Sequence, residues 1–261
     1  MSDPILLCAI VGAVGRLTLN RPRNGNAIDV ALADALMEAA VRLAEDQAVK
    51  VVTLTGNGRL FSAGGDIAAF AAGKPDVVIA RITVSLHAAI NRLATMPKPL
   101  ITLVNGPAAG AGLGLALLGD IVLAASSAHF TSAYTAIGVS PDAGTSWLLP
   151  RLIGLRRAQE MILTNRRVGA DEAKAIGLVT RVVADDALAT AGDELAQSLA
   201  TGATPALATA RRLLHRSHCS SLADHLEVEA AGIVAAARSD EAKARLSAFL
   251  GKDSAPRLSA P

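Results

Sequence analysis

Asn105-Gly106-Pro107-Ala108-Ala109-Gly110-Ala111-Gly112-Leu113-Gly114-Leu115 is the stretch around which the chain is organised. An apolar run at residues 100–104 precedes it and predicts a buried strand, and residues 113–118 predict the start of a buried helix. A tight turn of small residues between a strand and a helix leaves backbone N–H groups without helical partners. Such groups can bind a phosphate or a developing oxyanion. The alternative is that the small residues serve only tight packing, where larger side chains would clash.

A second turn of the same kind lies earlier in the chain. Phe61-Ser62-Ala63-Gly64-Gly65-Asp66-Ile67 follows residues 51–55, which predict a buried strand, and precedes a helical pattern. Two such turns in one chain are more informative than one, because each can present backbone N–H groups to a ligand.

The rest of the pattern predicts an α/β fold. Strands are expected at residues 5–10, 14–19, 51–55, 100–104, 121–125, 129–131 and 179–183, the first two as a hairpin. Helices are expected at 27–45, with Asn26 as N-cap, and at 76–96, 146–152, 156–163, 170–177, 186–200, 205–217, 222–237 and 240–250. Because only helical patterns follow residue 185, we expect a core of residues 1–197 and an all-helical region of residues 198–261.

Composition limits the classes of function. Hydrophobic residues make up 51% of the 261 residues, and the net charge is +2 with no basic cluster, which argues against a nucleic-acid partner. Cys8 and Cys219 lack metal-ligand spacing and favour a reducing compartment. Asp120 interrupts the longest apolar run, and the N-terminus lacks the basic start of a signal peptide. We therefore expect a cytoplasmic protein without a metal site or a membrane segment.

The two turns, together with Arg21-Pro22 and Asn26-Ala27, resemble the crotonase (enoyl-CoA hydratase/isomerase) superfamily. The resemblance extends from the first hairpin to Phe249-Leu250-Gly251-Lys252. It implies a spiral of repeated ββα units with an all-helical C-terminal region that forms homotrimers or dimers of trimers. It also implies an acyl-CoA thioester as substrate, with coenzyme A carried as part of the substrate and no separate cofactor.

The resemblance also implies the binding residues. In this superfamily one backbone N–H from each turn holds the thioester oxygen, and by position these belong to Gly65 and Ala111. Such donors stabilise an enolate-like oxyanion more than the ground-state carbonyl. Residues expected to bind coenzyme A or the acyl group are Arg23, Gly25, Ala63, Gly64, Asp66, Ile67, Tyr134 and Lys252. For Arg23, a solvated surface cation is the alternative interpretation.

The catalytic residues differ from those of a hydratase. Hydratases of the superfamily position water with two glutamates, and Gly114 and Tyr134 stand at those places here. Neither can serve as a carboxylate base at neutral pH, so simple hydration is not expected. The remaining carboxylate is Asp142, where several relatives carry a catalytic aspartate, although an Asp in this sequence could also cap a helix.

Residues 138–151 most resemble the 1,2-epoxyphenylacetyl-CoA isomerase and enoyl-CoA isomerase group. We therefore expect an isomerase that moves a double bond from the 3 to the 2 position, or isomerises a ring epoxide, with Asp142 as the single acid/base. The alternatives are an inactive acyl-CoA-binding homologue and a hydratase-like or dehalogenase-like enzyme. His87 lies in an apolar helical pattern and is interpreted as packed or solvated. The acyl group, and whether the pathway is fatty acid or phenylacetate metabolism, stay open.

Overall fold

The computed structural model describes residues 3–252, except for the side chain of Lys252. The chain divides into two compact units, and the change falls after Ala200, at the end of helix α8 (Leu188–Ala200). The two units are described separately. The first holds all the strands among the described residues, and the second is helical.

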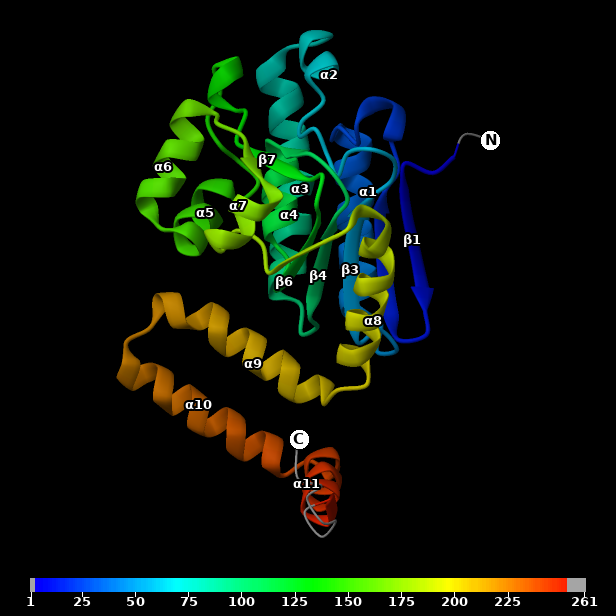
Figure 1. The fold of residues 1–261 in the computed structure, drawn as a ribbon, viewed down its shortest axis with the longest axis vertical. Helices are drawn as coiled ribbons and strands as arrows, with labels where there is room; N and C mark the ends of the chain where they lie inside the picture. Colours follow the sequence, from blue (N-terminus) through cyan, green and yellow to red (C-terminus); the bar gives the residue numbers. More distant parts are fainter. Residues whose placement is uncertain (1–2, 253–261) are drawn as a thin grey trace, which may run out of the picture. The chain divides into compact units, whose positions relative to one another are not determined.

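A six-stranded sheet forms the centre of the first unit (Figure 1). Its strands are β1 (Leu6–Val11), β2 (Val14–Leu19), β3 (Val51–Gly56), β4 (Leu100–Val104), β6 (Ile121–Ala125) and β9 (Arg181–Val183), adjacent in that order. β1 and β2 form the predicted antiparallel hairpin, and every other pair is parallel. β4 is buried along its whole length, as expected of an apolar strand in a parallel sheet covered on both faces.

The first unit also contains a second, three-stranded sheet. β5 (Ala108–Ala109) pairs in parallel with β7 (His129–Thr131), and β7 pairs in antiparallel with β8 (Val168–Gly169). A single parallel bridge joins Ser62 to Ala108 and continues this sheet. Each of β3, β4 and β6 is therefore followed by a short pairing segment and then by a helix, which confirms the predicted α/β fold of ββα units.

Helices cover both faces of the large sheet. The hydrogen of Gly15 in β2 points toward the side chain of Leu43 in α1 (Val30–Glu45), because a Cβ there would lie 2.8 Å from Leu43 Cδ2. The next residue, Arg16, faces the opposite side and pairs with Asp193 of α8 at 3.0 Å. Alternation along the strand thus places α1 and α8 on opposite faces.

The remaining helical segments of this unit lie between the strands along the chain, except for η3, which joins β9 to α8 (Figure 1). They are η1 (Pro22–Asn24), α2 (Ile67–Ala71), α3 (Pro75–Thr95), α4 (Ala111–Leu117), η2 (Thr135–Ile137), α5 (Thr145–Ile153), α6 (Leu155–Thr164), α7 (Ala170–Ala175) and η3 (Asp185–Ala187). The second unit contains α9 (Thr204–Arg216), η4 (Ser217–Cys219), α10 (Leu222–Ala237) and α11 (Asp240–Lys252). These three long helices confirm the predicted helical C-terminal region, and their role in a trimer stays a prediction.

Among the described helices, α3 is long and apolar enough to span a membrane by length and composition. Its residues Ile82, Leu86 and Leu93 are buried at helical spacing, whereas Val77 and Val84 are exposed. It packs along α1, where Ser85 Oγ donates to Asp34 Oδ1 at 2.5 Å. This one-sided burial is typical of an amphipathic helix on a globular core.

The predicted start of α1 is wrong by three residues. Its N-cap is Asp29, whose Oδ1 accepts the N–H of Leu32 at 2.8 Å, and not Asn26. Ile28 is held in extended conformation by its bridge to Gly65, so the helix cannot begin earlier. Asn26 is fully buried and fixes the loop instead, because its Nδ2 donates to the carbonyl of Leu60 at 2.8 Å.

The buried side chain of Lys98 caps the C-terminal end of α1. Lys98 lies between α3 and β4, and its Nζ donates to the carbonyls of Leu43 and Asp46, each at 2.6 Å. Burial lowers the pKa of Lys98, and the charge of Asp46 opposes that shift. A cation at a helix C-terminus also complements the helix dipole.

Replacing Lys98→Met keeps the apolar stem and removes the ammonium group. We expect a loss of about 1–3 kcal/mol in the free energy of unfolding, because two carbonyls lose their buried donor. Thermal unfolding should show a drop in Tm of about 2–4 °C per kcal/mol. Lys74→Met removes an exposed ammonium that caps nothing and is the control. An equal Tm for the two variants would contradict the role given to Lys98.

Candidate active site

The two glycine-rich turns lie against each other. The bridge between Ser62 and Ala108 sets their register, since the N–H of Ala109 donates to the carbonyl of Ser62 at 2.9 Å. Gly65 and Ala111 each lie three residues beyond a bridge partner. They therefore occupy equivalent positions in neighbouring ββα units.

Gly64 allows the close approach of the turns. Its φ is +95°, and a Cβ there would lie 2.7 Å from the carbonyl oxygen of Ala109 and 3.3 Å from the nitrogen of Ala111. Only glycine combines this dihedral angle with this contact without strain. The second turn thus packs backbone to backbone on the first.

The N–H groups of Gly65 and Ala111 make no hydrogen bond within residues 3–252. The parallel bridge to Ile28 uses the carbonyl of Gly64 and the N–H of Asp66, so the N–H of Gly65 points away from it. Ala111 is the first residue of α4, whose N–H has no helical acceptor. An oxyanion hole requires two free N–H donors that lie close together, and the expected pair, Gly65 and Ala111, lies on adjoining turns.

The guanidinium group of Arg21, a residue that the sequence pattern included without assigning it a role, holds the first turn. Arg21 Nη2 pairs with Asp29 at 3.0 Å and with Asp66 at 3.1 Å, and Arg21 Nη1 donates to the carbonyl of Ala27. Asp66 also caps α2, because its Oδ1 accepts the N–H of Ala69 at 3.1 Å. The carboxylate of Asp66 is therefore engaged inside the protein. No local pattern connects Arg21 with Asp66, which lies 45 residues away.

The residues predicted to bind coenzyme A gather around this turn, apart from Tyr134 and Lys252. The N–H of Ala63 donates to the carbonyl of Gly25 at 2.8 Å, and that of Gly64 donates to Ser62 Oγ at 3.2 Å. The N–H of Asp66 donates to the carbonyl of Ile28 at 3.0 Å. The carbonyls of Gly25, Gly64 and Asp66 already accept backbone N–H groups, so the carbonyl of Ala63 is the acceptor of this turn that remains for a ligand. Arg23 on η1 and Ile67 at the start of α2 are exposed. The side chain of Lys252 lies outside the described residues.

Asp142 lies beside Tyr134. The Tyr134 hydroxyl donates to Asp142 Oδ1 at 2.6 Å, and Tyr134 is buried whereas Asp142 is partly exposed. Burial, followed by the charge of Asp142, raises the pKa of Tyr134 far above its ordinary value of 10.0. Tyr134 therefore stays neutral and acts as a hydrogen-bond donor. The alternative of Asp142 as a helix cap is wrong, since Gly144 precedes α5 and no side chain caps that helix.

His87 also faces Asp142. Its Nε2 lies 3.9 Å from Asp142 Oδ2, and it accepts the N–H of Ala143 at 3.4 Å. The side chain of His87 is 51% exposed. The interpretation of His87 as merely packed or solvated missed this contact, which joins residues 55 positions apart and leaves no local sequence signal.

The Asp142 turn rests on the helix that begins at Ala111. Ala143 packs on Gly114 of α4, where a Cβ would overlap the Ala143 carbonyl oxygen. Gly114 is three residues beyond Ala111, about 4.5 Å along the helix axis. The turn that carries Asp142 therefore packs on the helix that begins with the free N–H of Ala111.

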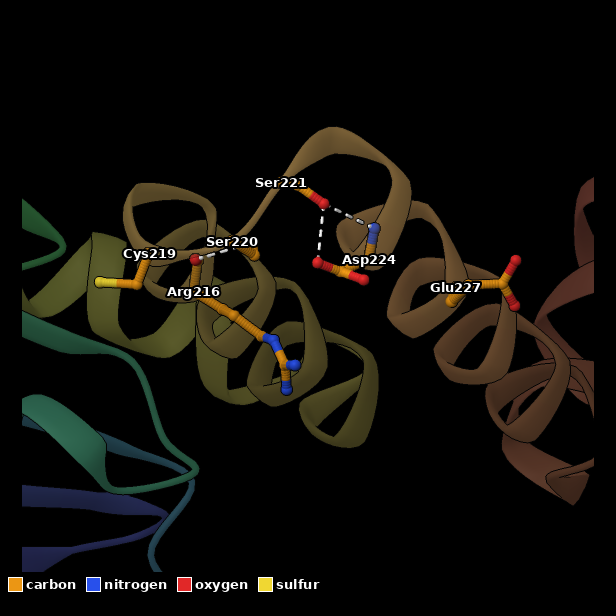
Figure 2. A pocket seen from close by; sticks show the side chains of 6 residues that line it. All are labelled: Arg216, Cys219, Ser220, Ser221, Asp224 and Glu227. Atoms are coloured by element: carbon orange, nitrogen blue, oxygen red, sulfur yellow. Dashed lines mark hydrogen bonds between the residues drawn. The ribbon is translucent and has the colours of Figure 1, made fainter.

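The second unit carries a separate hollow of about 580 Å³ (Figure 2). It is lined by Arg216, Cys219, Ser220, Ser221, Asp224 and Glu227. Figure 2 shows the hydroxyl of Ser221, the N-cap of α10, bonded to both the N–H and the carboxylate of Asp224. None of the site residues predicted from the sequence lines this hollow.

Comparison with known proteins agrees with the geometry. The sequence model described as "Enoyl-CoA hydratase/isomerase" matches residues 9–256. A 1,2-epoxyphenylacetyl-CoA isomerase of Escherichia coli K12 is 36% identical, covering 95% of this chain and 96% of that protein. A 4-chlorobenzoyl coenzyme A dehalogenase of an Arthrobacter species is 33% identical, covering 92% of this chain and 88% of that protein.

Solved structures give the same result. The crystal structure of an enoyl-CoA hydratase from Bacillus anthracis superposes with a TM-score of 0.91 at 30% identity, covering 95% of this chain and 97% of that chain. The names of these relatives thus refer to several different reactions on coenzyme A compounds. The chain belongs to the enoyl-CoA hydratase/isomerase family, and it has the crotonase fold.

Proposed function

We propose that this protein isomerises an unsaturated or epoxidised acyl-CoA through an enolate, with Asp142 as the single acid/base. The observation that carries the proposal is the position of the Asp142 turn on α4. One oxygen of Asp142 accepts the Tyr134 hydroxyl, and the carboxylate is partly exposed. The helix beneath begins at the free N–H of Ala111.

In the proposed reaction, the Asp142 carboxylate takes a proton from the carbon next to the thioester of a 3-enoyl-CoA. The bonding electrons move onto the thioester oxygen, where the N–H groups of Gly65 and Ala111 stabilise the negative charge. Protonated Asp142 then returns the proton to carbon 4, and the double bond ends at position 2. One carboxylate suffices, because the group that takes the proton also gives it back.

Hydration fits this site less well. A hydratase must orient water and deprotonate it while a carbon is protonated, which calls for two ionisable groups. Gly114 has no side chain, and the raised pKa of Tyr134 keeps its hydroxyl protonated at neutral pH. Isomerisation of a ring epoxide would use the same oxyanion donors, and the E. coli relative named for that activity supports this variant.

Coenzyme A would bind as part of the substrate, with no separate cofactor. The carbonyl of Ala63 can accept a hydrogen bond from an exocyclic amino group such as that of adenine, whereas the carbonyls of Ser62 and Gly64 already accept backbone N–H groups. The exposed guanidinium of Arg23 can pair with phosphate, and Ile67 presents an apolar side chain next to the turn. A homologue that binds acyl-CoA without turnover is the alternative to this proposal.

The contact of His87 with Asp142 favours a second candidate, nucleophilic aromatic displacement. Asp142 would attack a ring carbon that bears halogen, halide would leave with its bonding electrons, and an aryl ester would remain on Asp142. Water deprotonated by His87 would then attack the ester carbonyl, release the hydroxylated ring and restore Asp142. The dehalogenase relatives support this candidate by their names.

Ala111→Pro tests the oxyanion donor. Proline is tolerated at the first position of a helix, so α4 can still form, while the ring Cδ replaces the N–H hydrogen and also fills the space in front of it. We expect kcat for 3-enoyl-CoA isomerisation to fall about 10²–10³-fold, since one donor to the developing charge is lost. Leu155→Pro, at the exposed first position of α6, is the matched control. Equal kcat values in the two variants would contradict the role of Ala111.

Asp142→Asn tests the acid/base. We expect kcat to fall about 10²–10⁴-fold because the amide cannot accept the proton, while calorimetry still detects acyl-CoA binding. Asp193→Asn removes a carboxylate on α8 that pairs with Arg16, and it should retain activity. Turnover by Asp142→Asn at the wild-type rate would exclude Asp142 as the acid/base.

His87→Gln separates the two candidate reactions. If the protein acts on 4-chlorobenzoyl-CoA, this variant should accumulate an aryl ester on Asp142, because the base for ester hydrolysis is missing. Mass spectrometry of the peptide that contains Asp142 detects the ester. Absence of both chloride release and ester, together with 3-enoyl-CoA isomerisation, would leave the isomerase as the assigned activity.

A further inference from the structure

Gly114 and Ala143 are in closer contact than side chains would permit. A Cβ on Gly114 would overlap the carbonyl oxygen of Ala143 and would lie 2.9 Å from the Ala143 Cβ. The opposing atoms include backbone, which cannot rotate away as a flexible side chain can. Gly114 has no side chain, and Ala143 occupies the space in which the first atom of a side chain at position 114 would lie.

The turn that fills this space is held on several sides. Ala143 is fully buried and has a φ of +50°, which costs a residue with a Cβ about 1–3 kcal/mol. Its N–H donates to His87 Nε2 at 3.4 Å, and the carbonyl of Asp142 accepts the N–H of Thr145 at 2.9 Å. Tyr134 binds the Asp142 carboxylate from the other side. The surroundings thus fix the backbone on both sides of the Asp142 side chain.

We propose that Gly114 is a positioning residue that acts through Ala143 to place the Asp142 carboxylate. The proposal deepens the proposed function and rests on it for its catalytic consequence. A side chain at position 114 would overlap Ala143, so the turn that carries Asp142 would have to move to admit it. A side chain at position 114 would therefore act on the chemistry through the position of Asp142, and Gly114→Glu alone leaves Tyr134 at the place of the second glutamate of a hydratase.

Tyr134 is the single tyrosine of the chain, so its hydroxyl is a direct probe of the position of the Asp142 carboxylate. Tyrosine labelled with a carbon isotope at Cζ gives one NMR resonance, which reports the hydrogen bond and the charge of Asp142. In Gly114→Ala, we expect this resonance to move toward its position in Asp142→Asn. We expect kcat to fall about tenfold to a hundredfold, as for other small displacements of a catalytic group, with KM changed less than about threefold.

Gly192→Ala is the matched control. Its added Cβ would lie 2.5 Å from Leu103 Cδ1, a side-chain atom in the core, so it crowds packing without touching the Asp142 turn. It should lower Tm while leaving the Tyr134 resonance and kcat unchanged. The double variant Gly114→Ala with Ala143→Gly removes the contact between the two Cβ atoms and should recover part of kcat. This double variant also carries the test if Gly114→Ala alone does not fold.

A Tyr134 resonance that stays in place in folded Gly114→Ala would overturn the proposal, whatever the activity. A resonance that moves while kcat stays at the wild-type value would overturn the catalytic part. If the wild type has no isomerase turnover, the proposed function fails, and the resonance still decides whether Gly114 positions Asp142. A resonance that moves together with a loss of kcat supports the proposal.

Discussion

The candidate site depends on the register between two parallel strand extensions. The bridge from Ser62 to Ala108 places equivalent residues of two ββα units side by side, and Gly64 lets their backbones touch. Neither turn needs a polar side chain to present its N–H, since the parallel bridge and the helix start each leave one donor unused. The donors are fixed by the fold before any ligand arrives, so little reorganisation is needed when charge develops.

The sequence allowed much of the fold to be predicted, because long apolar strands and amphipathic helices are local patterns. The two-residue strands β5 and β8 were not predicted, since they exist only through pairing with distant segments. The start of α1 was misplaced because the extended bridge at Ile28 takes precedence over the helical preference of its neighbours. Each of these differences comes from contacts between segments far apart in the chain.

In the candidate site, too, local motifs could be predicted and contacts between distant segments could not. Gly65, Ala111 and Asp142 could be named from their motifs, and the structure brings the turns that carry them together. Arg21 and His87 could not be assigned, because their partners Asp66 and Asp142 lie 45 and 55 residues away. Ionic and hydrogen-bonded partners across such distances depend on how the ββα units stack, which hydrophobic periodicity does not encode.

The guanidinium of Arg21 has a mechanical consequence. It binds the caps of two helices, Asp29 before α1 and Asp66 before α2, and so ties the starts of both helices to one side chain. α2 has no buried residue and packs on α3. Phe70 of α2 lies against Gly65, since a Cβ on Gly65 would lie 2.5 Å from the Phe70 ring. Under the proposed function, an acyl group that displaces α2 would therefore also disturb the donor that Gly65 offers to the thioester.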